Sequence, residues 1–212
     1  MVPLINNSKK NSMIFSIIIT CYNREKLISR CIRSALHQKN INRYDYEIIV
    51  VDDFSKDGSL ERIDEFDSLI KIIKNKQNRG LASSRNVGLK KARGRYVVML
   101  DSDDFLAENF LFISGLFLDN NNWDAAATDY YKVNLKGAKI KKESAKKNPI
   151  ACGILFKKKC LESIKFYNQK LRLHEEVDLM KRFLKKFKLG FIHLPLYRYT
   201  KHRKSLTGIN KK

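Results

Sequence analysis

The sequence predicts an α/β fold, a single domain with a mostly parallel central sheet flanked by helices, and three observations support this prediction. Short β-branched apolar runs alternate with amphipathic segments over residues 15–104, as in sheets whose strands are joined by helical crossovers. The runs are apolar at nearly every position, which is typical of strands covered on both faces. The 212 residues, of which 43% are hydrophobic, are enough for one domain with a sizeable core.

The first half is predicted to contain four strands joined by three helices. The helix after the first apolar run carries Leu27, Ile28, Cys31 and Ile32, spaced as on one face of a helix. Gly94 stands where it can end the third helix, because glycine readily adopts the left-handed conformation found at helix ends. In order, the predicted ranges are strand 15–20, a helix from residue 25, strand 47–52, helix 59–66, strand 70–73, helix 81–92 and strand 95–100.

The second half has weaker periodicity and no internal repeat. A Lys-rich polar stretch over 136–147 is expected to be an exposed loop or hairpin tip, and a solvated loop without function is the simpler explanation for it. No linker is long enough for a domain boundary, so we expect a polar tail over 1–14 and one domain over 15–212. The remaining predicted elements are helix 109–118, strand 123–131, helix 176–188 and strand 191–199.

The charge is strongly positive, because 43 Lys and Arg against 22 Asp and Glu give a formal net charge of +21. Such a surplus favours anionic partners, namely nucleic acid, phosphorylated ligands or an anionic membrane surface, without choosing among them. The lysines are spread along the whole chain, and Asn and Ile are abundant with them. An AT-rich genome therefore explains part of the charge equally well.

Localisation and redox state are inferred from segments that the sequence lacks. No apolar run approaches the ~20 residues that span a bilayer, and the polar start NNSKKNS lacks the apolar region of a signal peptide. We expect a cytoplasmic protein, whose charge is compatible with peripheral contact on the inner face of the cell membrane. Cys21, Cys31, Cys152 and Cys160 form no C-x-x-C pair, so we expect free thiols and no zinc site.

Polar residues directly follow three of the predicted strands, at 20–23, 52–53 and 101–104. Because ligands of parallel sheets bind outside the carboxyl ends of the strands, we expect these clusters to converge on one edge. The three aspartates of the last cluster repel one another unless a cation or hydrogen-bond donors compensate, and their hard oxygens suit Mg²⁺ or Mn²⁺. A lone D-x-D pattern is weak evidence, because an acidic loop that caps the next helix has the same sequence.

Five segments together resemble the family 2 glycosyltransferases, which have the GT-A fold. They follow the family's order and spacing over about residues 15–105, and the resemblance returns at 174–179 and 197–206. It implies one Rossmann-like GT-A domain, with a nucleotide-sugar-binding half over 15–104 and an acceptor half over 105–212. The segments are FSIIITCYN from Phe15, EIIVVDD from Glu47 with Ser55 and Asp57-Gly58, Asn78-x-Gly80 with Arg85-Asn86-x-Gly88, Ala92-x-Gly94-x-Tyr96, and LDSDD from Leu100.

The resemblance implies roles for residues at the strand ends. Thr20 and Tyr22 match positions that contact the nucleotide base, Tyr22 by packing against its flat face. Asp53 matches a carboxylate that accepts a hydrogen bond from a uracil-type N–H, and Arg85 matches a basic residue near the nucleotide. Taken singly, such a tyrosine is more often a loop aromatic, and such an aspartate is more often a turn residue bonded to its own backbone. Their joint occurrence at strand ends favours the nucleotide site.

The same resemblance implies a bound Mn²⁺ or Mg²⁺ ion. Asp101 matches a position near the ribose and the metal, and Asp103 matches the main metal ligand. His202, in a late segment with Arg and hydroxyl residues, matches a residue that completes the metal site or touches the diphosphate. Neutral imidazole is a suitable ligand for Mn²⁺. A solvated basic tail is the alternative explanation for His202.

A general base is implied within HEEVDL, residues 174–179, at the start of the last predicted helix. In the family an acidic pair opens the acceptor-side helix, and its second member, here Glu176, takes the proton of the attacking hydroxyl. The family more often has Asp at this position, so Glu175 and Asp178 stay as alternatives. For Glu175 we favour acidic capping against the helix dipole.

We therefore expect an inverting, metal-dependent glycosyltransferase that uses a UDP-sugar and acts on a glycan or lipid-linked acceptor, in surface polysaccharide, lipooligosaccharide or glycoprotein synthesis. A nucleic-acid-binding module suits the charge, but the sequence has no RNP-type aromatic pair, zinc spacing or recognition helix, so no nucleic acid is expected. A non-catalytic nucleotide-binding scaffold is less favoured because candidates for the metal ligand and the base are both present.

Overall fold

The computed structural model describes residues 14–150 and 152–202, and the predicted tail over 1–14 lies almost entirely outside them. The strands are β1 (Phe15–Cys21), β2 (Tyr46–Asp52), β3 (Lys71–Lys74), β4 (Tyr96–Asp101), β5 (Phe105–Leu106), β6 (Ala125–Val133), β7 (Lys139–Glu143), β8 (Ile154–Lys157) and β9 (Leu189–Thr200). The helices are α1 (Glu25–Leu36), α2 (Ser59–Asp64), α3 (Leu81–Lys91), α4 (Phe110–Asn120), α5 (Lys158–Ser163) and α6 (Glu175–Leu184), with a 3-10 turn over Arg43–Asp45.

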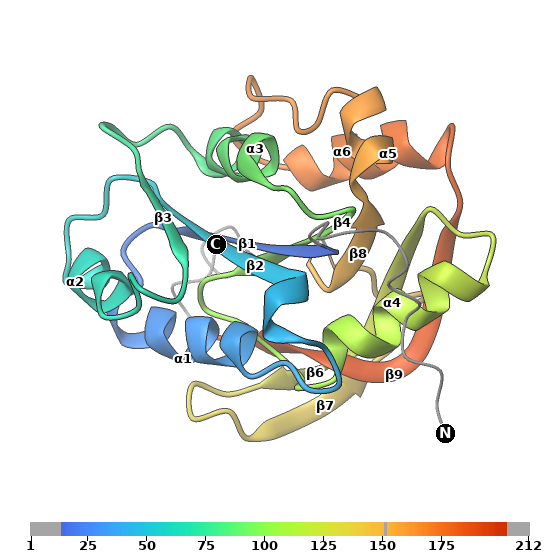
Figure 1. Ribbon diagram of the computed structural model, residues 1–212, viewed down its shortest axis with the longest axis horizontal. Helices are drawn as coiled ribbons and strands as arrows, with labels where there is room; N and C mark the ends of the chain where they lie inside the picture. The colour runs from blue at the N-terminus through green and yellow to red at the C-terminus, as the bar shows by residue number, and fades with distance from the viewer. Residues whose placement is uncertain (1–13, 151, 203–212) are drawn as a thin grey trace.

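One sheet runs through the molecule in the order β3-β2-β1-β4-β8-β6-β9-β5, and β7 pairs with β6 beside this path (Figure 1). The β3-β2-β1-β4 part is parallel throughout, as the alternation of strands and helices predicts. Beyond β4 the sheet is mixed, because β8 runs antiparallel to both of its neighbours while β6 and β9 are parallel. The chain is therefore an α/β domain whose parallel part comes from its first half.

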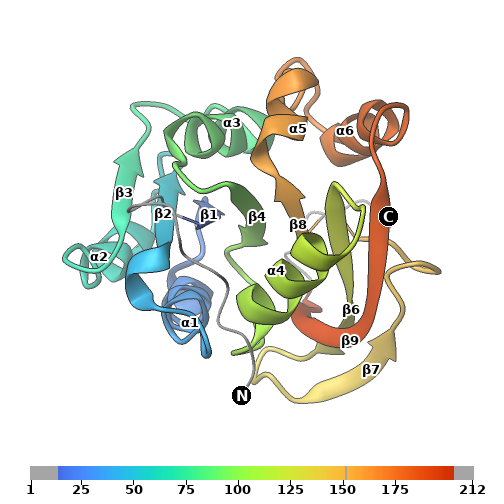
Figure 2. The same cartoon turned by 45° about the vertical axis from the view of Figure 1, so that its right-hand side comes forward.

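Two hydrophobic cores cover the two faces of the sheet. Helices α1 and α4 pack on one face, with Ile28, Ile32 and Phe110 fully buried there. Helices α3, α5 and α6 cover the other face, where Leu89 and Phe183 are fully buried, and the two layers are visible above and below the sheet in Figure 2. β1 and β2 are buried at every position, which explains their continuous apolar sequences.

The prediction that Gly94 ends the third helix is wrong. The helix α3 ends at Lys91, and Ala92 after it is already extended. Gly94 instead lies against the backbone of β1, where an added Cβ would stand 2.5 Å from the carbonyl carbon of Phe15 and from the nitrogen of Ser16. A glycine is required here because the two backbones approach too closely for any side chain.

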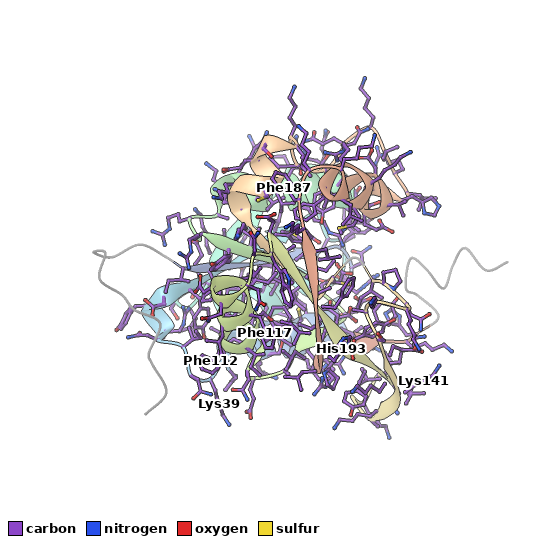
Figure 3. The ribbon with its side chains drawn as sticks, turned by 90° about the vertical axis from the view of Figure 1, so that its right-hand side faces the viewer. Lys39, Phe112, Phe117, Lys141, Phe187 and His193 are labelled. Carbon is purple, nitrogen blue, oxygen red and sulfur yellow. The ribbon has the colours of Figure 1, made fainter. Side chains whose placement is uncertain are left out.

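The Lys-rich stretch is the second arm of a hairpin. Its residues 139–143 form β7, which pairs antiparallel with the end of β6. The side chain of Asn134 accepts hydrogen bonds from the backbone N–H groups of Lys136 and Ala138 and so holds the connecting turn. Figure 3 shows Lys141 on this hairpin at the rim of the molecule.

Among the described helices, none combines the length and the apolar character that crossing a bilayer requires.

Candidate functional site

The predicted strand-end residues do converge on one edge of the sheet. Thr20 pairs with Asp101 across β1 and β4, and Asp53 directly follows the last residue of β2. Ile18, Val51 and Met99 belong to the hydrophobic core under α3. Thr20, Asp53 and Asp101 each come two residues after one of them. Because side chains alternate between the two faces of a strand, all three polar residues lie on the α3 face.

Asp53 organises the loop that leads into α3. Its Oδ1 accepts hydrogen bonds from Asn75 Nδ2 at 2.8 Å and from the backbone N–H of Arg79 at 2.9 Å. Its Oδ2 accepts from the backbone N–H of Gly80 at 2.8 Å. The carboxylate is buried and takes three of the roughly four hydrogen bonds that its oxygens can accept. Tyr22, which directly follows the neighbouring strand β1, is 44% exposed.

Arg85 of α3 connects the first half of the chain to the second half. It is 2% exposed, and its Nη2 donates to Asp101 Oδ1 at 2.8 Å while its Nη1 lies 3.4 Å from Glu175 Oε1. The guanidinium also lies over the ring of Tyr167, 5.3 Å from its centre. Burial is the largest single influence and lowers the pKa of Arg85, but the surrounding groups, Asp101 foremost with Tyr167 and Cys152, together outweigh it and raise the pKa above the ordinary arginine value. The cation therefore stays charged behind Asp101.

The acidic turn after β4 brings Asp103 and His202 together. The Nε2 of His202 makes a hydrogen bond of 2.8 Å with Oδ2 of Asp103, and the Nε of Arg24 lies 3.6 Å from the same oxygen. The two side chains therefore lie close enough together to bind the same divalent cation in place of this hydrogen bond. Carboxylate oxygen and imidazole nitrogen are both ligands that Mn²⁺ accepts.

Asp104 serves the structure of this turn. Its Oδ2 accepts from the hydroxyl of Tyr197 at 2.8 Å, and its Oδ1 accepts from the backbone N–H of Thr200 at 2.7 Å. The carboxyl is fully buried, and this burial raises its pKa well above the ordinary value. Asp104 thus fastens the end of β9, which precedes His202, to the acidic turn.

Two further residues at the site, Cys152 and Arg30, were not predicted from the sequence. The Cys152 thiol donates to Asp101 Oδ2 at 3.1 Å, and ligand atoms of Cys152, Asp101 and Asp104 lie within 4.8 Å of one another. The expectation of free cysteines is confirmed, since all four are buried and unpaired. Arg30 donates to the carbonyl of Asp103 at 3.0 Å and to the carbonyl of Leu135 at 2.7 Å. It therefore ties the acidic turn to the lysine hairpin.

The three candidate carboxylates of α6 have different surroundings. Glu175 is buried and faces Arg85, and its burial raises the pKa of its carboxyl. Asp178 accepts from Nε and Nη2 of Arg182, at 2.9 and 2.7 Å, on its own helix. Glu176 is half-buried and makes no hydrogen bond or ion pair with any residue that the structure describes. Glu176 is thus the carboxylate of the three that has no protein partner.

Residues 16–186 match the family model described as Glycosyl transferase family 2. An uncharacterised glycosyltransferase of Rickettsia conorii is 38% identical over 132 residues, which cover 61% of this chain and 21% of that protein. The Escherichia coli UDP-Glc:alpha-D-GlcNAc-diphosphoundecaprenol beta-1,3-glucosyltransferase WfgD is 38% identical over 122 residues, covering 57% of this chain and 47% of that one. The chain therefore spans about one fifth to one half of the length of these relatives.

Solved structures have the same fold. Staphylococcus aureus TarS 1–349 in complex with UDP superposes with a TM-score of 0.78 at 24% identity, over 90% of this chain and 61% of that chain. The mannosyltransferase PcManGT from Pyrobaculum calidifontis, in complex with GDP-Man and Mn²⁺, superposes with a TM-score of 0.72 at 16% identity, over 90% and 58% of the two chains. At these identities the likeness is one of fold.

Proposed function

This chain belongs to glycosyl transferase family 2, whose members transfer sugars from nucleotide-sugars, and on that premise we propose that it moves a sugar from a UDP-sugar to an acceptor hydroxyl with inversion at the anomeric carbon. The observation that carries the proposal is the convergence of Thr20, Asp53 and Asp101 on one face of one sheet edge, beside the pair of Asp103 and His202. In this proposal the first three residues belong to the base-binding surface, and Asp103 and His202 form the metal-binding pair beside it.

The donor lies along the edge of the sheet. Tyr22 packs against the base, Thr20 lines its pocket, and Asp53 accepts the base N–H with its remaining acceptor position. Asp101 faces the ribose. Arg85, buried behind Asp101, acts through that carboxylate by fixing its position.

Asp103 and His202 would hold a Mn²⁺ or Mg²⁺ ion, with Asp101 at its edge. Bound there, the ion supplies positive charge that stabilises the departing nucleoside diphosphate. Arg24, whose Nε lies 3.6 Å from Asp103, adds a second positive charge from the chain itself. Arg30 of α1 donates to the backbone carbonyl of Asp103 and so holds this turn in place.

Glu176 is the general base in this proposal. It takes the proton of the acceptor hydroxyl as that oxygen attacks the anomeric carbon from the side opposite the leaving diphosphate. The half-buried carboxylate without a protein partner is free to do so, whereas Glu175 and Asp178 are each held by an arginine. Glu175 instead anchors the start of α6, and so the position of Glu176, to Arg85.

The acceptor is a growing surface glycan or a lipid-linked sugar, presented at the inner face of the cell membrane. One relative is named for an acceptor on a diphosphoundecaprenol lipid and another as a poly(ribitol-phosphate) beta-N-acetylglucosaminyltransferase. A nucleic-acid partner is not part of the proposal, because the carboxylates of Asp101 and Asp103 repel phosphate in the absence of a metal.

UDP is expected to stabilise the protein in the presence of Mn²⁺. At ~100 times its dissociation constant, a ligand that binds only the folded state adds about 2.7 kcal/mol of stability. Thermal unfolding measured with UDP, GDP and CDP, each with Mn²⁺ and with a chelator, tests this directly. Equal shifts for all three nucleotides would contradict the uracil preference, and metal-dependent hydrolysis of a UDP-sugar separates an active enzyme from a scaffold that only binds.

The lysine hairpin is expected to dock the enzyme on anionic lipid. Arg30 donates hydrogen bonds to the turn of the hairpin and to the acidic turn, so the hairpin lies beside the site. Lys141 lies on the hairpin at the rim of the molecule (Figure 3). Each Lys near an anionic surface is worth about 1 kcal/mol. A variant with Gln at five hairpin positions should lose salt-sensitive co-sedimentation with anionic vesicles and keep its UDP affinity. The five positions are Lys139, Lys141, Lys142, Lys146 and Lys147.

A charge-matched control removes five lysines from the opposite region of the acceptor half. If this variant loses vesicle binding and the hairpin variant keeps it, the hairpin is only a solvated arm. If neither wild type nor variants sediment with vesicles, the membrane contact itself is wrong. The control positions are Lys170, Lys181, Lys185, Lys186 and Lys188.

A further inference from the structure

An arginine of the acceptor half lies over the loop that Asp53 holds in the donor half. Gly80, the residue before α3, has a backbone φ of +84° and donates its N–H to Asp53 Oδ2. A Cβ added to Gly80 would stand 3.0 Å from Nη1 of Arg172, which belongs to the segment just before α6. The guanidinium of Arg172 therefore reaches across the two halves, to the face where the base-binding residues lie.

Arg172 has no partner for its charge in the described part of the chain. It is exposed, and it makes no hydrogen bond or ion pair with residues 14–150 or 152–202. It also stands at the amino-terminal end of α3, where the helix dipole places partial positive charge. Asp53 is the carboxylate of this loop, and three N–H donors already occupy it. The donors of Arg172 are therefore available to a ligand.

We propose that Arg172 is a specificity-determining residue of the donor site, which donates to a carbonyl oxygen of the base beside the N–H that Asp53 accepts. The inference rests on the proposed function. Uracil presents a ring N–H flanked by two carbonyl oxygens, so a carboxylate with a guanidinium beside it matches that edge. Cytosine has an unprotonated ring nitrogen at the same place, so an acceptor atom would face the carboxylate oxygens of Asp53, which also only accept hydrogen bonds. Asp53 and Arg172 together thus select UDP over CDP.

Arg172 also connects base recognition to the acceptor side. It precedes α6 by three residues, and the first residue of α6, Glu175, faces Arg85, which in turn binds Asp101. A base that engages Arg172 fixes the segment leading to Glu176. Donor binding and placement of the general base are in this way joined through one short stretch of chain.

Arg172→Ala is expected to weaken uridine and UDP binding by the same factor, roughly ten- to hundredfold, because a hydrogen bond from a charged donor is lost in both complexes. The measurement is calorimetric titration of the full chain with uridine and with UDP in the presence of Mn²⁺. The melting temperature of the nucleotide-free protein should stay unchanged, since Arg172 has no described protein partner. Lys170→Ala, which removes an exposed charge two residues away, should bind both ligands like wild type.

Three outcomes would overturn the inference. A loss for UDP but not for uridine would move Arg172 to the phosphates, and unchanged affinity for both would make it a solvated surface residue. Equal weakening in Lys170→Ala would reduce the effect to general electrostatics. In each of these cases wild-type UDP binding leaves the proposed function standing, whereas a wild-type chain that binds no nucleotide contradicts the proposed function and this inference together.

Discussion

Glu176→Gln is expected to lose sugar transfer by roughly 10²–10⁴-fold while UDP binding stays at the wild-type level. Glutamine keeps the size of the side chain but cannot take a proton from the acceptor hydroxyl. The carboxylate of Glu176 has no hydrogen bond or ion pair in the described structure, so the substitution should cost little stability. Transfer from a UDP-sugar, measured beside UDP titration and thermal unfolding, separates loss of chemistry from loss of structure.

The neighbouring carboxylates supply matched controls for this result. Asp178→Asn weakens an ion pair with Arg182 on the same helix and should keep most of the transfer activity. Glu175→Gln leaves the buried Arg85 with one charged partner fewer, so lower stability is the expected effect. If Asp178→Asn is inactive and Glu176→Gln is active, the general base is Asp178, two residues after the proposed position.

Asp103→Ala is expected to remove the metal dependence of UDP binding and to lower transfer by about 10²–10³-fold. The physical reason is that loss of the main ligand removes positive charge from the place where the diphosphate departs, a change comparable to loss of a preorganised oxyanion donor. UDP titrations with Mn²⁺ and with chelator measure the first effect, and transfer assays over a range of Mn²⁺ measure the second.

Glu108→Gln is the control for the metal prediction. Glu108 is an exposed acidic residue that pairs with Lys39 on the surface, so its removal changes the net charge without touching the acidic turn. Wild-type UDP affinity that is the same with chelator as with Mn²⁺ would contradict a metal at Asp103. Metal dependence that survives in Asp103→Ala would shift the site to Asp101, Asp104 and Cys152, whose ligand atoms also lie close together.

The parallel half of the fold was predictable because its signals are local. A continuous apolar run such as β1 or β2 specifies a buried strand by itself, and the polar residues that follow must then meet at one edge. Beyond β4 the prediction missed β5, β7 and β8. These strands are two, five and four residues long, and β7 is exposed at most positions, so neither length nor apolar period marks them. Pairing with β6 and β9 is what makes them strands.

The sequence by itself determined the α/β class and the placement of Thr20, Asp53 and Asp101 at one edge, and its resemblance to the family favoured Glu176 as the base, with Glu175 and Asp178 as alternatives. Only the tertiary structure decided which charges face each other. Arg85 and Glu175 are 90 residues apart in sequence, and Asp103 and His202 are 99 apart, so no local period connects them. The approach of Arg172 to Gly80 and of the Cys152 thiol to Asp101 depends likewise on how the second half of the chain packs against the first half. Such contacts arise from packing of distant segments, which composition and spacing do not encode.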